Sequence, residues 1–281
     1  MANWLKSISW TLASATLLIG FAALAQFEDS EIDEADQAGV SEPSKLEVDS
    51  KDLKALAEAR ANKSEEALVR AASRVLGADS KNLIALNTLG VFYFEQGKYG
   101  LARIIFLRAL RDHNQTPALH NNLGIVYLAE GKQRQALAEF RKALEIKSDY
   151  RVSAANLGSI FLEYKDFERA LKPLESGYKA TRSELKSGTP YAMEVANNYA
   201  IALTGAGQFD AAKDVYDEIV AGSTRNPTVL LNYAILLVEK LKNYKEGSKL
   251  LSRIKFAVDD PKVLKRVEEL DYKASTGGKE Q

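Results

Sequence analysis

The stretch that decides the fold runs from Pro117 to Tyr150, PALHNNLGIVYLAEGKQRQALAEFRKALEIKSDY. Apolar residues recur in it at the spacing of two short amphipathic helices, Leu119 to Tyr127 and Leu137 to Leu144. Gly131 lies between them, where a helix must end and turn and where positive φ is often needed. One such helical hairpin cannot bury its own apolar face, so the stretch predicts neighbouring copies of itself.

Copies are present at a fixed interval. Leu-Gly pairs stand at Leu89, Leu123 and Leu157, each 34 residues from the next, and two Tyr-Ala pairs, at Tyr199 and Tyr233, are also 34 residues apart from each other. We count each unit from its first residue, namely Leu83, Pro117, Arg151, Met193 and Pro227. The eighth position is then Gly or Ala in every unit, the twentieth is Ala in four units, and the twenty-fourth is Phe, Leu or Tyr in the same four.

This pattern resembles the tetratricopeptide repeat family, whose 34-residue helix–turn–helix unit stacks into a right-handed superhelical solenoid. The resemblance covers roughly residues 51–260. It implies an all-α solenoid of about six repeats, of which the first, 48–82, is degenerate. Departures from the family pattern are a missing Trp at the fourth position, a missing Pro at the thirty-second and a one-residue shift after Glu239.

The chain has 281 residues, no cysteine and a formal net charge of zero. The missing cysteine excludes disulfides, iron–sulfur clusters and thiolate metal sites. Charge is unevenly placed. Residues 26–52 contain ten acidic and two basic residues (−8), whereas residues 53–281 contain 35 basic and 28 acidic residues (+7). An excess of seven spread along a solenoid does not indicate nucleic acid binding.

The amino-terminal segment predicts export. No residue between Lys6 and Glu28 is charged, and Ala23-Leu24-Ala25 has the form of a signal-peptidase cleavage site. We expect a signal peptide at 1–25, and a periplasmic or secreted protein. The alternative is an uncleaved anchor in the inner membrane, because the 21 uncharged residues from Ser7 to Phe27 are long enough to span a bilayer.

The remaining segments divide the chain further. We expect an acidic disordered linker at 26–50, because it has too few apolar residues to offset its ordering entropy. The solenoid should occupy 51–273 and end in a capping helix from Pro261 to Tyr272, with a flexible tail at 274–281. Eight extra residues separate Gly158 from Ala200, since the distance is 42 rather than 34. We interpret them as a lengthened second helix that ends at Gly188-Thr189-Pro190.

The resemblance also implies where a partner binds. In tetratricopeptide solenoids the second, fifth, sixth, ninth and twelfth positions of each unit line the concave groove, and we call this set the first-helix face. Its carboxamides could bond the backbone of an extended peptide, and its apolar residues could contact a partner's apolar side chains. Alternatively, the asparagines bond within the solenoid. The residues predicted to bind a partner are Asn87, Val91, Phe94, Asn121, Asn122, Ile125, Leu128, Asn156, Asn197, Asn198, Ile201, Asn232 and Ile235.

The sequence does not favour catalysis. The two histidines, His113 and His120, have no carboxylate at a ligand or dyad spacing, so we expect neither a metal site nor a general base. We therefore expect no cofactor and no enzymatic activity. The favoured function is a scaffold of the bacterial envelope that holds a peptide or helix of a partner protein, for assembly of a pilus, secretion or motility machine. The alternative is a regulatory or substrate-presenting subunit of a cell-wall enzyme.

Overall fold

The computed structural model describes residues 48–221 and 224–277. The expected signal peptide or anchor, and the acidic linker before Val48, lie outside these residues. The described chain divides into two compact units, one before Ala154 and one from Ala154 onward. All the secondary structure in the described part is helical, and no helix in that part combines the length and apolarity needed to cross a membrane.

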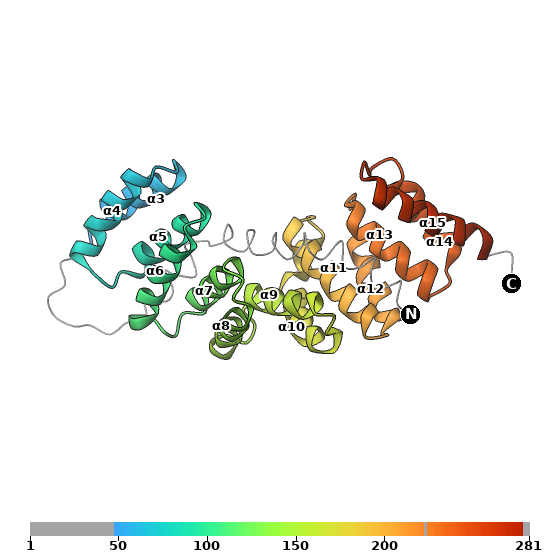
Figure 1. Cartoon of the computed structure of the whole chain (residues 1–281), viewed down its shortest axis with the longest axis horizontal. Helices are drawn as coiled ribbons and strands as arrows, with labels where there is room; N and C mark the ends of the chain where they lie inside the picture. The colour runs from blue at the N-terminus through green and yellow to red at the C-terminus, as the bar shows by residue number, and fades with distance from the viewer. Residues whose placement is uncertain (1–47, 222–223, 278–281) are drawn as a thin grey trace. The chain divides into compact units, whose positions relative to one another are not determined.

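The first unit contains three helix–turn–helix pairs that pack in chain order (Figure 1). Each pair corresponds to one 34-residue sequence unit. The helices are α3 (Ser50–Ala61), α4 (Glu65–Ala78), α5 (Leu83–Glu95), α6 (Tyr99–Asp112), α7 (Pro117–Ala129) and α8 (Gln133–Ile146).

The second unit repeats the arrangement and ends in a single helix (Figure 1). The boundary between the units falls in the first turn of α9. The helices are α9 (Arg151–Glu163), α10 (Phe167–Thr181), the 3₁₀ helix η1 (Arg182–Leu185), α11 (Pro190–Gly205), α12 (Phe209–Ala221), α13 (Pro227–Ile235), the π-helix η2 (Leu236–Lys240), α14 (Tyr244–Ile254) and α15 (Pro261–Gly277).

The turns inside the first five pairs share one conformation. One residue of each turn has positive φ, and the next N–H bonds a carbonyl five residues back, as Lys132 bonds Tyr127 at 2.7 Å; in the last pair the N–H of Asn243 bonds the carbonyl of Leu237, six residues back, at 2.8 Å. This is the hydrogen bond that closes a helix with a left-handed residue at its end. The residues with positive φ in the turns inside the six pairs are Lys63, Gly97, Gly131, Lys165, Gly207 and Lys242. The predicted turn at Gly131 is therefore confirmed.

The one-residue shift after Glu239 has a structural cause. Lys242 occupies the sixteenth position of its unit, and the extra residue is absorbed by η2, where helical bonds span five residues. The N–H of Leu241 accordingly bonds the carbonyl of Leu236 at 3.0 Å. Helix α14 can thereby pack on α13 despite the extra residue between them.

The small eighth position allows each first helix to touch its second helix. A Cβ added to Gly90 or Gly124 would lie 2.6 Å from the ring of Phe106 or Phe140, and one added to Gly158 would lie 2.4 Å from Leu174. These are the partners at the twenty-fourth position of the same units. All three partner side chains are fully buried. The recurrence of Gly at one position and a large apolar residue at the other thus reflects direct packing.

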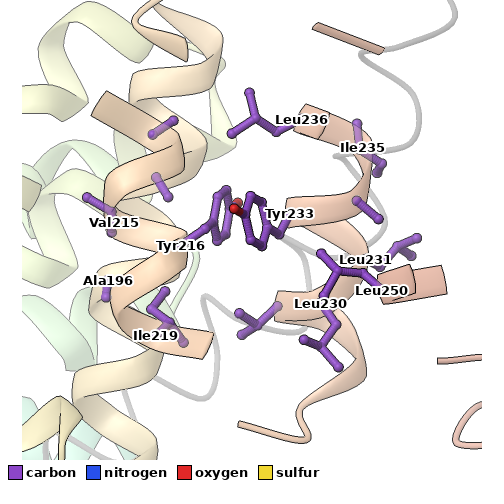
Figure 2. Packing of buried hydrophobic residues seen from close by; sticks show 14 of the residues in the cluster. Ala196, Val215, Tyr216, Ile219, Leu230, Leu231, Tyr233, Ile235, Leu236 and Leu250 are labelled. Atoms are coloured by element: carbon purple, nitrogen blue, oxygen red, sulfur yellow. The ribbon is translucent and has the colours of Figure 1, made fainter. Parts of the chain in front are cut away.

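Neighbouring repeats of the second unit share an apolar core. In the second unit, the rings of Tyr216 on α12 and Tyr233 on α13 stack with centroids 5.1 Å apart (Figure 2). Both rings are about 1% exposed. Figure 2 shows Ile219, Leu230 and Leu236 around them. Because this pair joins two successive sequence units, it buries surface that one hairpin alone would leave in water.

Two boundaries differ from those expected. The second helix before the insertion does not lengthen as an α-helix: α10 ends at Thr181, tightens into η1, and Pro190 starts α11. The closing helix is longer than expected, because α15 continues to Gly277 and Ala274 is only 6% exposed. Val267, Leu270 and Ala274 form one apolar stripe, which extends the helix through residues expected in the tail.

Candidate functional site

The first-helix face is more deeply packed than an open groove would be. Of the residues predicted to bind a partner, all except the partly exposed Leu128 are buried, with 0–6% of their surface accessible. Phe94, for example, packs its ring 5.3 Å from that of Tyr99. The face therefore does not present the broad apolar surface that its composition implies. Partner binding at these residues stays a prediction.

The asparagines of this face bond one another between successive first helices. In the first unit, Asn122 Nδ2 on α7 donates to Asn87 Oδ1 on α5 at 2.9 Å. In the second unit, Asn232 Nδ2 on α13 donates to Asn197 Oδ1 on α11 at 3.1 Å. In both cases the sixth position of one unit donates to the fifth position of the unit before it. Bonding within the solenoid, the alternative left open by the sequence, therefore accounts for these amide groups.

Two serines of α9 take part in the same hydrogen bonding between first helices, and the sequence analysis did not predict them. Ser153 donates to Asn121 Oδ1 at 3.0 Å, and Asn198 Nδ2 donates to Ser159 Oγ at 3.3 Å. All four residues are buried. The signal was present, since Ser159 is at the ninth position, where the other units carry Val or Ile. A hydroxyl in an otherwise apolar row indicates a polar partner nearby.

Two amide oxygens are left without a donor among the described residues. Asn122 Oδ1 and Asn198 Oδ1 are both buried and accept no hydrogen bond, although the Nδ2 of each residue donates. Both occupy the sixth position of a first helix. A buried acceptor without a donor costs about 1–3 kcal/mol, so such an oxygen usually meets an ordered water or a further donor.

Glu194 is the second functional candidate that sequence reasoning missed. It lies at the second position of its unit, one helical turn before Asn197 and Asn198 on α11. Burial raises the pKa of its carboxyl from 4.5 to about 7, and burial is the one cause that acts on it. No hydrogen bond or ion pair within the described chain engages this carboxylate. The sequence signal is that Glu194 is the sole charged residue on the first-helix face of the five units from Leu83 onward.

The histidines lie away from this face and have structural contacts. His120 Nδ1 lies 2.7 Å from Glu139 Oε2, and its Nε2 lies 3.0 Å from the carbonyl oxygen of Asn114. The carboxylate partner of His120 is Glu139 of α8, 19 residues away in sequence, which folding brings against α7 and which the spacing around the histidine did not indicate. Both ring nitrogens are occupied, which leaves neither for a substrate or a metal. Within the described residues no three His, Asp or Glu side chains are grouped as metal ligands.

The insertion forms a separate surface feature of the second unit. A hollow of about 650 Å³ lies between η1 and α12, lined by Arg182, Ser183, Leu185, Lys186, Glu218 and Ala221. Arg182 is paired with Glu218, which also accepts a hydrogen bond from Tyr178 at 2.7 Å. Two of the hollow's charged lining residues, Arg182 of η1 and Glu218 of α12, are thus paired with each other and hold η1 on α12.

Sequence comparison supports the repeat family over the first part of the chain. A tetratricopeptide repeat family model matches residues 53–117 and 93–151. These ranges contain helices of α3 to α8, together with the turns and the Gly–Phe contacts described above. The comparison with curated proteins finds no match.

Solved structures share the fold over a larger part of the chain. The crystal structure of YrrB, described as a TPR protein with an unusual peptide-binding site, has a TM-score of 0.59 at 14% identity and covers 70% of this chain and 97% of its own. PilF of Pseudomonas aeruginosa has a TM-score of 0.53 at 21% identity, with coverages of 70% and 89%. The C-terminal part of a TPR repeat-containing protein from Cytophaga hutchinsonii has a TM-score of 0.56 at 14% identity, with coverages of 72% and 78%. At these identities the likeness is one of fold, an all-α solenoid of the tetratricopeptide type.

Proposed function

We propose that this protein is a non-enzymatic scaffold of the bacterial envelope that binds a peptide or helix of a partner protein on its first-helix face. Tetratricopeptide folds serve as protein–protein interaction scaffolds, and no catalytic constellation stands out among the described residues. The described site instead consists of amides, hydroxyls and one carboxylate on stacked first helices. Of these groups, the amide oxygens of Asn122 and Asn198 have no donor among the described residues, and a polypeptide N–H could bond them.

The observation that carries the proposal is the pair of acceptors without donors, Asn122 Oδ1 and Asn198 Oδ1. They occupy the same position of two different repeats. A polypeptide offers backbone N–H donors, so an extended segment bound to either compact unit could satisfy the acceptor in that unit. YrrB, which has a similar fold, is described as having a peptide-binding site, and a peptide-binding role for this chain agrees with that likeness.

The envelope location rests on the amino-terminal sequence. The uncharged run from Ser7 to Phe27, with Lys6 before it and Ala23-Leu24-Ala25 near its end, supports export to the periplasm or retention at the inner membrane. A scaffold in that compartment would hold a component of a pilus, secretion or motility machine during assembly.

In-cell crosslinking tests the proposal. Leu128 is the one predicted partner-binding residue that is partly exposed. A photoreactive amino acid at this position should crosslink a defined envelope protein through one segment of its chain. The matched control places the same amino acid at Ala138, an exposed residue of the second helix α8 in the same repeat.

The two positions distinguish the outcomes. Capture of one envelope protein from Leu128 and not from Ala138 supports the first-helix face. Capture from Ala138 alone would move the interaction to the second helices and contradict the assignment. Fractionation of the tagged chain into periplasm, inner membrane and cytoplasm tests its location in the same cells, and a cytoplasmic chain would refute the export proposal.

A further inference from the structure

Helix α6 presents three apolar side chains to solvent on the side away from α5. Leu101, Ile104 and Leu107 follow one another at three-residue spacing, and 46%, 60% and 40% of their surfaces are exposed. Phe106, by contrast, is fully buried against Gly90 of α5. We call the three exposed residues the α6 stripe. Contiguous exposed apolar side chains of this kind usually mark an interaction site.

The other repeats have no apolar stripe at these positions. Leu101, Ile104 and Leu107 occupy the nineteenth, twenty-second and twenty-fifth positions of their unit. The equivalent positions of α4, α8, α10 and α12 carry charged, polar or alanine side chains. They are Ala67, Arg70 and Ser73; Gln135, Ala138 and Arg141; Arg169, Lys172 and Glu175; and Ala211, Asp214 and Asp217. The α6 stripe is therefore specific to one repeat and does not belong to the packing that the repeats share.

Positive charge borders the α6 stripe. Arg108 and Arg111 follow Ile104 by four and seven residues, which places them on the same side of α6, and both are exposed. Arg108 Nη2 donates to a neutral acceptor, the carbonyl oxygen of Ser80, at 3.0 Å, so this contact does not offset its charge. A segment that covers the stripe should therefore combine apolar side chains with carboxylates.

The chain's own amino-terminal part contains a segment of this composition. Residues 27–36, FEDSEIDEAD, contain six carboxylates and no basic residue, with Phe27 and Ile32 among them. We call these residues the acidic segment. It stays in the chain whether or not the expected signal peptide is cleaved after Ala25. Its charge is opposite to that of Arg108 and Arg111, and its apolar side chains suit the α6 stripe.

The acidic segment is long enough to reach α6. Ile32 precedes Val48, the first described residue, by 16 positions. A flexible chain of that length spans about 20 Å on average and about 50 Å when fully extended. Helix α3 packs on α4, and a salt bridge of 2.7 Å between Lys98 and Glu65 ties the start of α6 to the start of α4. The beginning of the described chain and the α6 stripe therefore belong to the same compact unit.

We propose that the acidic segment folds back on the exposed side of α6, with Ile32 on the α6 stripe and its carboxylates near Arg108 and Arg111. Tethering raises the local concentration of such a segment to about the millimolar range, so a contact too weak to hold a separate peptide is still populated. Because the covered side of α6 is opposite to the side that packs on α5, docking leaves the first-helix face free for a partner.

Engineered disulfides test this contact, because the chain has no native cysteine to interfere. The test pair is the full chain with Ser30→Cys and Gly100→Cys. Gly100 is an exposed position of α6 at which an added Cβ meets no atom within 4 Å. The control pair combines Ser30→Cys with Ser73→Cys, an exposed position of α4. Helix α4 packs directly on α3, where the described chain begins, so a segment that moves at random should reach Ser73 at least as often as Gly100.

We expect the intramolecular disulfide to form about tenfold faster in the test pair than in the control pair, because docking raises the local concentration at α6. The reaction is followed under mild oxidation as a faster-migrating monomer on a non-reducing gel. Added to the test pair, Ile104→Ala should slow the reaction about fivefold, since it removes apolar surface from the middle of the stripe. Lys172→Ala, at the same repeat position in α10, should leave the rate unchanged.

Two results would overturn the proposal. Equal rates in the two pairs, or a faster reaction at Ser73, would show that the acidic segment does not dock on α6. The second result concerns a mixture of chains that carry only Ser30→Cys with chains that carry only Gly100→Cys. A disulfide-linked dimer that forms in this mixture as fast as the intramolecular bond would give the α6 stripe to a second copy of the chain.

Discussion

Gly124 and Phe140 lie in direct contact, so that a Cβ added to Gly124 would come within 2.6 Å of the Phe140 ring. The first and second helices of the repeat pack against each other at this point. Phe140 is fully buried, and protein cores are closely packed, so an added Cβ must displace its ring. The same contact recurs in the repeats before and after, at Gly90 and Gly158.

We predict that Gly124→Ala lowers the free energy of unfolding by about 1–3 kcal/mol, the usual cost of overpacking a core. The control is Gly100→Ala in helix α6, where an added Cβ meets no atom within 4 Å. That change should be neutral or should stabilise the helix by about 1 kcal/mol. Urea unfolding monitored by circular dichroism measures both. Equal effects of the two substitutions would show that the Gly124–Phe140 contact does not restrict this position.

The Asn87–Asn122 hydrogen bond should couple the first two complete repeats. Replacing either residue with Ala leaves a buried amide of the other without its partner, which costs about 1–3 kcal/mol. The double substitution should cost less than the sum of the two single ones, by about 1 kcal/mol. A double-mutant cycle of unfolding free energies gives this coupling energy. Strict additivity would mean that the two amides do not interact in solution.

Lys165 occupies a turn position at φ 58°, a conformation that favours glycine. We predict that Lys165→Gly stabilises the chain by about 0.5–1 kcal/mol, because it removes the steric cost of a left-handed side-chain-bearing residue. The opposite sign is expected for Lys172→Gly, an exposed position inside α10, which should lose about 1 kcal/mol of helix stability. Thermal unfolding of the two variants checks the sign. Destabilisation by Lys165→Gly would contradict the observed turn geometry.

Glu194 makes stability depend on pH in a defined direction. Its pKa is raised from 4.5 to about 7, so the folded chain holds its proton at pH values where the unfolded chain has lost it. This group therefore costs stability as pH rises from about 4.5 to 7, and the cost is constant above that range. Glu194→Gln should raise the unfolding free energy by about 1–2 kcal/mol at pH 8, allowing for its partial exposure, and by much less at pH 5.

Unfolding by urea at the two pH values measures this effect, with Glu268→Gln as the reference for a solvent-exposed acid. A gain from Glu194→Gln that is the same at both pH values would contradict a buried, uncompensated carboxylate.

The repeat register was predictable because it depends on local chemistry. Helix ends, the turn at Gly131 and the cap at Ser64, whose hydroxyl accepts from the N–H of Ala67 at 3.4 Å, all follow from residues close in sequence. The small eighth position was likewise visible as a recurring Gly or Ala. Its partner at the twenty-fourth position follows from the same period.

The content of the site was not predictable in the same way. Whether Asn122 faces a ligand or Asn87 depends on the distance between α5 and α7. The spacing of residues along one helix does not give that distance. The role of Glu194 depends on how much of its carboxylate the neighbouring helices cover. Similarly, the residue inserted after Glu239 was visible as a shift, but its absorption by a π-helix required the backbone.

The measurement that tests the central claim most directly is a structure of the chain bound to the partner segment captured at Leu128. If the partner binds the first-helix face, a nitrogen donor of that segment should lie within about 3.2 Å of Asn122 Oδ1 or Asn198 Oδ1. A segment bound along the second helices, with both oxygens still lacking a donor, would contradict it.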